Sequence, residues 1–198
     1  AGGHIAGICS SGSGTITIDH CYNLGNIESG AGATKVDLCG ISRHNVTSCF
    51  NAGTIIQRSD CYSDAAIYAV TPSASNGAGC FNAGDMYSNF TNANAFVDNG
   101  TNKTSHYNIA RIHGLTSVVG GAYYDPKRVH SYTRAGSNGA SRTTAQMTAA
   151  GFMSSDYWVC EAGYYPRVKG LDTLTISKAL CLPIYFSGDD YVDSVTTS

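Results

Sequence analysis

The sequence predicts an all-β protein with the fold of a parallel β-helix (β-solenoid), in which short coils of strand stack on one another. A heptapeptide recurs at about 30-residue intervals, beginning at Cys21, Cys49 and Cys80, and a unit of this length is too short to bury its apolar side alone. Residues 15–18 (Thr-Ile-Thr-Ile) alternate with the period of a strand. Gly- and Ser-rich breaks at residues 10–14 and 73–77 separate such pieces.

The composition excludes several classes of protein. A hydrophobic fraction of 42% argues against disorder. The net charge of −2 and the lack of a basic run argue against a nucleic-acid partner held through its phosphates. No apolar stretch approaches the ~18–20 residues of a membrane span, so we expect no span in this chain. The opening Ala1-Gly2-Gly3-His4 has neither an initiator Met nor a signal peptide, and we expect a piece of a longer protein.

The heptapeptide has the pattern Cys, aromatic, Asn, small or aliphatic, Gly, polar, aliphatic, in residues 21–27, 49–55 and 80–86. A looser match precedes each copy, at residues 5–8, 38–41 and 67–70. Equivalent positions of successive coils stack about 4.8 Å apart in a parallel β-helix, so like side chains should form ladders. We expect hydrogen-bonded Asn side chains, a column of aromatic rings, and Gly residues with positive φ. The predicted ladders are Asn23, Asn51 and Asn82; Cys21, Cys49 and Cys80; Gly25, Gly53 and Gly84; Tyr22, Phe50 and Phe81; and, filling the interior, Ile27, Ile55 and Met86.

The eight cysteines contain no Cys-x-x-Cys pair, which argues against structural zinc and thioredoxin-like redox chemistry. Neighbouring cysteines of the ladder would have a backbone separation that a disulfide tolerates. Their side chains run parallel, however, which favours buried, reduced thiols over disulfides. Cys160 and Cys181 lie outside the repeats and are the best single candidates for a disulfide.

The remainder of the chain is assigned in order. Residues 92–108 are polar and predicted to form a loop, whereas residues 109–119 and 122–124 supply one or two degenerate coils. Weak helical periodicity spans residues 143–152. The solenoid domain is therefore placed at residues 1–170, with clear repeats at 2–90, degenerate coils at 91–142 and a closing region at 143–170. Residues 171–198 form either a cap of the solenoid end or the start of a following β domain, and an open coil end needs a cover.

Residues 5–27, read as I-A-G-I … G-T-I-T-x-x-x-C-Y-N-x-G-N-I, resemble the GLUG-motif repeats of bacterial cell-surface proteins. The resemblance covers residues 2–90 and weakens where Ala69-Val70-Thr71-Pro72 replaces the usual Gly-containing pair. Residues 145–158 and 163–166, with a Trp and a Tyr-Pro pair, look like the region that closes such arrays. The resemblance implies a secreted or surface-anchored β-solenoid module of a multidomain chain, and it does not imply an enzymatic site.

Residues with the chemistry of a site are few. A β-helix enzyme that cleaves polysaccharide would have to bring its carboxylates together in one groove, and the candidates are Asp37, Asp60, Asp64 and Asp125. Gly188-Asp189-Asp190 with Asp193 could offer oxygen ligands to calcium, although such a turn is more typical of empty surface. We predict no metal and no cofactor. The aromatic pairs most able to stack on a sugar ring or a partner protein, or else to cover the apolar flank of the solenoid, are Tyr123, Tyr124, Tyr164 and Tyr165.

The sequence therefore predicts a non-catalytic, extracellular module of a bacterial surface protein, with an adhesion, stalk or self-assembling role. Its expected partners are a host or environmental glycan or protein, or a second copy of itself through end-to-end or edge-strand contacts. The alternative is a β-helix enzyme or a carbohydrate-binding module that acts on polysaccharide. Ice binding would need a Thr-x-Thr ladder over many coils, and only residues 15–17 and 173–175 have that spacing.

Overall fold

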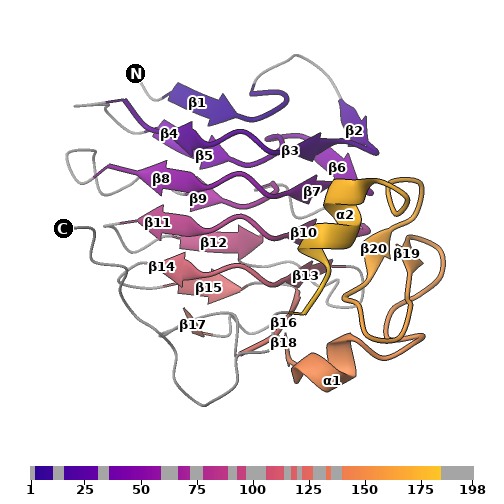
Figure 1. Ribbon diagram of the computed structural model, residues 1–198. Helices are drawn as coiled ribbons and strands as arrows, with labels where there is room; N and C mark the ends of the chain where they lie inside the picture. Colours follow the sequence, from indigo (N-terminus) through magenta and orange to yellow (C-terminus); the bar gives the residue numbers. More distant parts are fainter. Residues whose placement is uncertain are drawn as a thin grey trace.

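The computed structural model describes residues 3–10, 16–30, 36–58, 67–71, 78–88, 93–96, 106–113, 117–119, 122–126, 133–134 and 140–183. Over these residues the chain is all-β, with short strands, two short helices and largely parallel sheets (Figure 1). The predicted fold class is confirmed at this level. The N-terminal strand lies at one end of a stack of strands, and later strands follow along the stack in chain order.

Three parallel sheets run along the stack. The first contains, in spatial order, β1 (Gly3–Ala6), β5 (Val36–Cys39), β9 (Ile67–Tyr68), β12 (Ala93–Phe96), β15 (Ser117–Val119) and β17 (Thr133–Arg134). The second contains β3 (Tyr22–Asn23), β7 (Phe50–Asn51), β10 (Cys80–Asn82), β13 (His106–Asn108), β16 (Tyr123–Tyr124) and β18 (Ala140–Ser141). The third contains β4 (Ile27–Glu28), β8 (Ile55–Gln57), β11 (Met86–Ser88) and β14 (Ile112–His113). A separate parallel pair is formed by β2 (Thr17–Asp19) and β6 (Asn45–Thr47).

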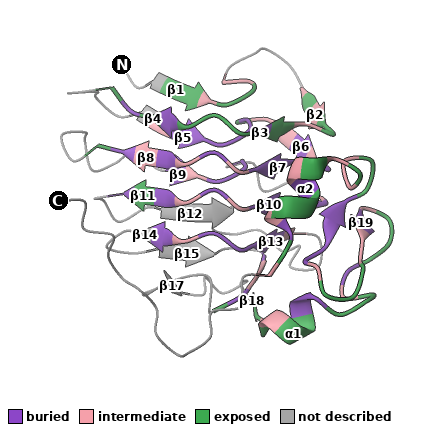
Figure 2. Cartoon of the chain, viewed as in Figure 1, coloured by how far each residue is buried: buried purple, intermediate pink, exposed green. Residues whose placement is uncertain are grey.

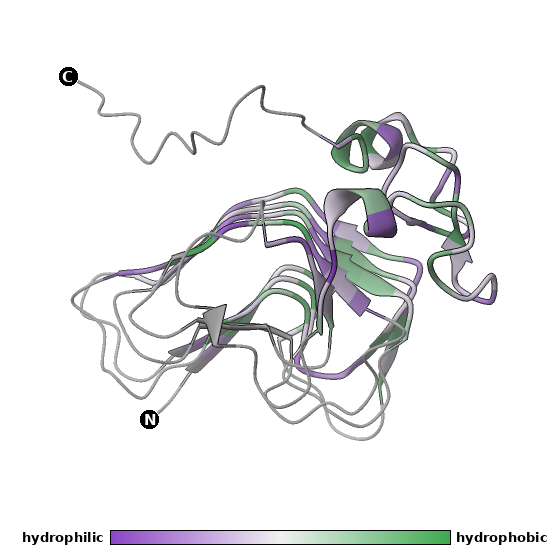
Figure 3. Ribbon diagram, turned by 90° about the horizontal axis from the view of Figure 1, so that it is seen from below, coloured by the Kyte–Doolittle hydropathy of each residue, from purple (hydrophilic) through white to green (hydrophobic). Residues whose placement is uncertain are grey.

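Each of the first four passages of the chain contributes one strand to each of these sheets, and the next two contribute strands to the first and second sheets; we call such a set of strands a rung. The first rung contains β1, β3 and β4; the second β5, β7 and β8; the third β9, β10 and β11; and the fourth β12, β13 and β14. Neighbouring rungs pair in register, so that Tyr22 lies opposite Phe50 and Phe50 lies opposite Phe81. Seen along the stack, the strands of successive rungs overlie one another (Figure 3).

Alternation along the second sheet sends neighbouring side chains to opposite faces. Cys49 and Cys80 face the interior, where they pack with buried aliphatic side chains that include Leu38, Ile41, Ile55, Ile67, Met86 and Ile112. Phe50 and Phe81 face the other way and belong to a second apolar cluster. The described residues thus form two cores on opposite faces of the second sheet.

Residues 143–183, here called the flank segment, provide the second core with its cover. They contain α1 (Thr144–Met147), β19 (Trp158–Val159), β20 (Arg167–Val168) and α2 (Thr175–Leu180), and β19 pairs with β20 antiparallel. The buried residues of this cluster are Phe50, Phe81, Tyr107, Ile109, Met147, Met153, Trp158, Tyr165, Val168 and Cys181. Figure 3 shows the flank segment beside the stack of strands. It therefore covers the stack along its side, and α2 with residues 171–183 belongs to this side cover.

The structure corrects one prediction about the middle of the chain and sharpens another. Residues 93–96 and 106–108 form strands β12 and β13, where a loop was predicted for residues 92–108. Strands pair through backbone N–H and C=O groups, which polar and apolar residues supply equally. The polarity of the side chains at residues 92–108 therefore does not distinguish a strand from a loop. The predicted helical segment at residues 143–152 is confirmed for α1, which begins with a capping box formed by Thr143 and Gln146.

Candidate functional site

The asparagines of the three heptapeptides lie directly over one another. Asn23 Nδ2 donates to Asn51 Oδ1 at 2.9 Å, and Asn51 Nδ2 donates to Asn82 Oδ1 at 2.9 Å. The same Nδ2 atoms also donate within their own rungs, from Asn23 to Gly25 O at 2.8 Å and from Asn51 to Gly53 O at 2.9 Å. Asn51 and Asn82 are fully buried. Their amides are satisfied inside the stack, as buried polar groups must be.

This asparagine ladder extends one rung beyond the copies that the sequence analysis identified. Asn82 Nδ2 donates to Asn108 Oδ1 at 2.8 Å. Residues 106–112 (His-Tyr-Asn-Ile-Ala-Arg-Ile) follow the pattern of the heptapeptide, with His106 in the place of Cys and Ala110 in the place of Gly. The aromatic-Asn pair of the heptapeptide, Tyr107-Asn108, is the sequence signal for this copy. The Cys and Gly that make the other three copies recognisable are both replaced here. In the next rung Tyr124 pairs with Asn108, and the asparagine ladder ends there.

The aromatic residues next to the asparagines form a column on the outer face of the second sheet. Successive rings of Tyr22, Phe50, Phe81 and Tyr107 stack with centroids 5.1, 4.8 and 5.0 Å apart and planes within 14° of one another. Trp158 of the flank segment lies with its ring centroid 5.2 Å from that of Tyr107. The column is therefore covered from the second rung onward, whereas Tyr22 keeps 38% of its surface exposed.

The ladder cysteines face the interior as free thiols. Cys49 Sγ accepts a hydrogen bond from Cys21 N at 3.2 Å and donates to Thr47 O at 3.0 Å. In the fourth rung His106 Nδ1 takes over the acceptor role and receives the Cys80 N–H at 3.3 Å. Burial raises the pKa of Cys49 to about 12 and the pKa of Cys80 well above its ordinary value. Thiols held protonated in this way are poor nucleophiles at neutral pH.

Cys160 and Cys181, the best candidates for a disulfide, do not form one, because both are free thiols. Cys181 follows α2, and its Sγ lies 3.4 Å from Tyr107 Oη. Cys160 follows β19, and its Sγ donates to Met153 O at 3.7 Å. The packing of the flank segment against the aromatic column places the two sulfur atoms in different contacts. Outside a repeat, spacing along the sequence does not indicate which side chains lie next to each other.

The predicted positive φ of Gly25, Gly53 and Gly84 is also wrong. The left-handed backbone conformation lies one residue before each ladder cysteine, at His20, Ser48 and Gly79, with φ of 49°, 51° and 66°. Close approach of the neighbouring rung is what requires glycine within the heptapeptide. A Cβ on Gly53 would lie 2.0 Å from Gly25 O, and one on Gly84 would lie 2.1 Å from Gly53 O.

The four tyrosines proposed as ligand contacts lie in three different environments. Tyr165 is buried and its hydroxyl donates to Asp125 Oδ2 at 2.8 Å, so it is a core residue and its assignment as a ligand contact is wrong. Tyr123 and Tyr124 form β16 and are half-buried, with Tyr124 packed against the interior core. Tyr164 is half-buried, and the Arg167 guanidinium lies 5.1 Å from its ring centroid.

The candidate carboxylates that the structure describes do not converge. Asp37 on β5 in the second rung lies 3.3 Å from His4 Nδ1. Asp125 follows β16 three rungs further along, is buried, and accepts from the hydroxyls of Tyr165 and Thr144. Three steps of about 4.8 Å separate the two carboxylates by roughly 14 Å or more. The other residues considered as catalytic or calcium-binding groups lie outside the described residues: Asp60, Asp64, Gly188, Asp189, Asp190 and Asp193. Within the described ranges, no three His, Cys, Asp or Glu side chains are grouped as metal ligands would be.

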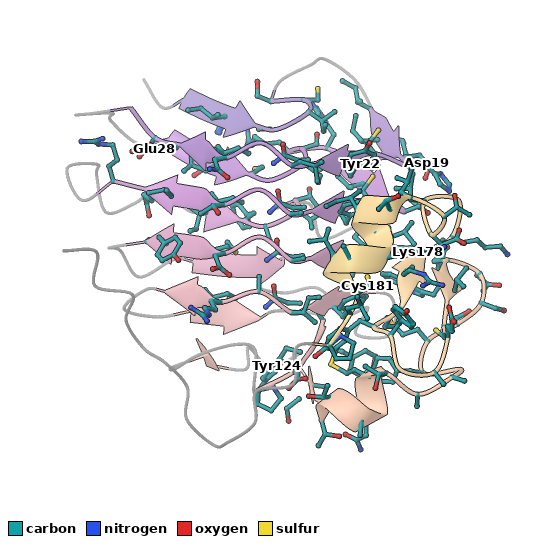
Figure 4. All side chains as sticks on the ribbon, in the orientation of Figure 1. Asp19, Tyr22, Glu28, Tyr124, Lys178 and Cys181 are labelled. Atoms are coloured by element: carbon teal, nitrogen blue, oxygen red, sulfur yellow. The ribbon has the colours of Figure 1, made fainter. Side chains whose placement is uncertain are left out.

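The surface feature that remains is the open edge of the first rung. β1, β3 and β4 are the terminal strands of their sheets. Of the six exposed large hydrophobic side chains in the described part of the chain, four belong to this rung: Ile5, Ile8, Tyr22 and Leu24. Figure 2 shows β1 as largely exposed and β7 and β10 as buried, and Figure 4 labels Tyr22 at this end of the stack. We call these four side chains, with the backbone of β1, β3 and β4, the first-rung edge.

Comparison of the chain with protein-family models, with curated proteins and with solved structures finds no match. Among the residues that the structure describes, no helix has the length and apolar character needed to cross a membrane.

Proposed function

We propose that this chain is a non-catalytic β-solenoid module of the GLUG-repeat kind, carried on the surface of a bacterium or secreted by it. Its role is that of a stalk, an adhesion element or a self-assembling element, with a glycan, a protein or another copy as partner. The observation that carries the proposal is the asparagine ladder, in which like side chains of successive rungs lie directly over one another.

The chemistry of the interior supports a structural role. The buried amides of Asn51 and Asn82 are engaged with neighbouring ladder amides and with backbone carbonyls. Asp125 is committed to two hydroxyls, and burial holds the thiols of Cys49 and Cys80 protonated. Among the described residues, these polar groups are thus engaged in contacts within the stack or between the stack and the flank segment.

The arrangement also supports a stiff element. In a stack of short rungs each rung contacts its neighbours, so length grows by addition of rungs while the cross-section stays constant. Here a hydrogen-bonded side-chain ladder lies on one face of the second sheet and a column of stacked rings on the other. Two independent sets of contacts therefore resist the bending or sliding of one rung against the next.

Assays on a panel of polysaccharides test this proposal against the enzyme alternative. We expect the protein to be captured by a glycan or protein surface, or to associate with itself in sedimentation, without release of new reducing ends. Release of reducing ends that is lost in Asp37→Asn and retained in Asp156→Asn would overturn the proposal. Asp156 is a suitable control because its exposed carboxylate contacts only its neighbour Ser154 among the described side chains.

A further inference from the structure

We propose that Arg142 and the aromatic rings beside it bind an acidic glycan, with a uronate carboxylate on the guanidinium and a sugar ring against Phe152. This inference rests on the proposed function, because it names the class of glycan that the same module binds. We call Arg142, Tyr123 and Phe152 the Arg142 site. The site lies where the second sheet ends, at β16 and β18, and Figure 1 shows α1 beside these strands.

Arg142 takes the place of the next ring in the aromatic column. Tyr123 lies opposite Tyr107 of the preceding rung and opposite Ala140 of the following rung, which carries no ring. Backbone pairing continues past β18, because Arg142 N donates to Tyr124 O at 2.9 Å. The Arg142 guanidinium lies 5.0 Å from the centroid of the Tyr123 ring. A cation is therefore stacked on the ring at this end of the column.

The stacked guanidinium keeps donors available to a ligand. Its N–H groups lie in the plane of the group, and stacking on a ring engages the face of the guanidinium rather than these donors. Arg142 is half-buried. Among the described residues its side chain makes one hydrogen bond, from Nη1 to Ser141 O at 2.9 Å, and no ion pair with a carboxylate. The remaining donors have the fork geometry that pairs with both oxygens of a carboxylate.

A second arginine–tyrosine pair, in the flank segment, shows what the Arg142 site lacks. The Arg167 guanidinium lies 5.1 Å from the ring centroid of Tyr164, and Arg167 Nη2 donates to Glu161 Oε2 at 2.8 Å. A carboxylate of the chain itself thus completes that pair. Asp125, which follows β16, is buried and engaged by two hydroxyl groups instead of Arg142. A ligand is therefore the source of the carboxylate that would complete the Arg142 site.

The rings of the site favour an acidic sugar over a small anion. The ring centroids of Tyr123 and Phe152 lie 5.0 Å apart, with 55° between the ring planes. Both side chains are half-buried, so part of their apolar surface remains accessible. Binding sites of this kind combine apolar aromatic surface with a few polar groups that fix orientation. A uronate matches both features, because its carboxylate is attached directly to a ring with apolar C–H faces.

The proposal is tested by the binding of labelled oligomers of galacturonate and glucuronate to the whole chain, followed by fluorescence anisotropy. We expect saturable binding of at least one oligomer, and none of its methyl ester, which keeps the sugars and lacks the charge. Arg142→Gln and Arg142→Lys should each weaken binding by about tenfold or more, because lysine keeps the charge but not the fork. Arg58→Gln is the matched control, because it removes the same charge from the exposed ion pair between Arg58 and Glu28.

Urea unfolding followed by Trp158 fluorescence verifies that the variants are folded. Absence of saturable binding, binding that Arg142→Gln leaves unchanged, or equal weakening by Arg58→Gln would overturn the proposal. Binding of a glutamate-rich peptide as tight as that of the oligomers would assign the site to an acidic protein and would also overturn it. Reducing ends are measured in the same samples. Their release would contradict the proposed non-catalytic function, whereas failure of binding alone leaves that function standing.

Discussion

The first and third rungs carry the same heptapeptide in two different environments. Tyr22 of the first rung is 38% exposed, whereas its equivalent in the third rung, Phe81, is completely buried. Phe81 lies between Phe50 and Tyr107, with ring centroids 4.8 and 5.0 Å away, and Tyr22 contacts Phe50 alone among the described rings. The same sequence pattern therefore contributes different amounts of free energy, because the contribution comes from neighbouring rungs on both sides.

The largest expected difference between the two rungs comes from removal of the ring. Phe81→Ala should lower the free energy of unfolding by about 4 kcal/mol, the range found for fully buried aromatic residues. Tyr22→Ala should cost about 1 kcal/mol, because only part of its apolar surface is removed from water. Urea denaturation, followed by Trp158 fluorescence, measures both.

Phe50→Leu is the control, because it removes the ring but keeps most of the apolar volume. It should lower the free energy of unfolding by less than Phe81→Ala does. Equal losses for Tyr22→Ala and Phe81→Ala would contradict the comparison, because they would mean that the first rung is as well covered as the third.

The asparagine ladder provides the second test of the difference. Asn51→Ala removes the ladder acceptor of Asn23 Nδ2 and one of the donors to Asn82 Oδ1, in a position that is fully buried. Each buried polar group left unsatisfied costs about 1–3 kcal/mol, so we expect a loss of about 3 kcal/mol. Asn23→Ala should lower the free energy of unfolding by about 1 kcal/mol, since Asn23 has a ladder partner on only one side among the described residues.

Asn51→Gln tests whether the geometry of the ladder is what matters. It keeps the amide and adds one methylene, so it should be destabilising like Asn51→Ala if the stacking distance is strict. The same urea unfolding curves decide it. Full stability of Asn51→Gln would contradict a ladder that depends on one side-chain length.

Much of this arrangement follows from the sequence, because a repeat states which residues are equivalent. Asn23, Asn51 and Asn82 were predicted to lie over one another, and the hydrogen bonds at 2.9 Å place them so. The fourth copy at residues 106–112 escaped notice, because His106 and Ala110 replace the two residues that made the pattern visible. The stack accommodates His106, because its Nδ1 accepts from Cys80 N the hydrogen bond that Cys49 Sγ accepts from Cys21 N.

The flank segment could not be derived in the same way. Nothing in residues 143–183 repeats, so the burial of Tyr165 and the separation of Cys160 from Cys181 depend on tertiary packing against the aromatic column. The function of the interior glycines was misjudged for a related reason. A sequence shows that glycine recurs, but not whether φ or a neighbouring carbonyl requires it.

Substitution of glycine by alanine tests whether a neighbouring carbonyl, rather than φ, requires glycine. It also compares the stability of the first and second rungs. Gly53→Ala should cost about 2 kcal/mol, because its Cβ would lie 2.0 Å from Gly25 O and the rungs would have to part. Gly25→Ala should be within about 0.5 kcal/mol of the parent, because its nearest neighbour would be Asn23 Oδ1 at an ordinary 3.5 Å. Thermal unfolding of the two variants measures the difference, and similar losses would mean that a further rung already covers Gly25.

The interior thiols give an effect that is confined to alkaline pH and is absent at neutral pH. Burial raises the pKa of Cys49 to about 12, against an ordinary value of 9.0. Below pH 9 both the folded and unfolded chains hold the proton, and the stability from this burial is fully present. As the pH rises from about 9 to 12 the unfolded chain loses its proton first, so the free energy of unfolding falls by up to about 1.4 kcal/mol per pH unit for each such thiol.

Cys49→Ala should therefore make the alkaline decrease in the free energy of unfolding less steep, as measured by urea unfolding at several pH values. This change in slope is separate from any loss of stability that the cavity causes at neutral pH. An alkaline decline as steep in Cys49→Ala as in the parent chain would contradict a buried, protonated Cys49 thiol.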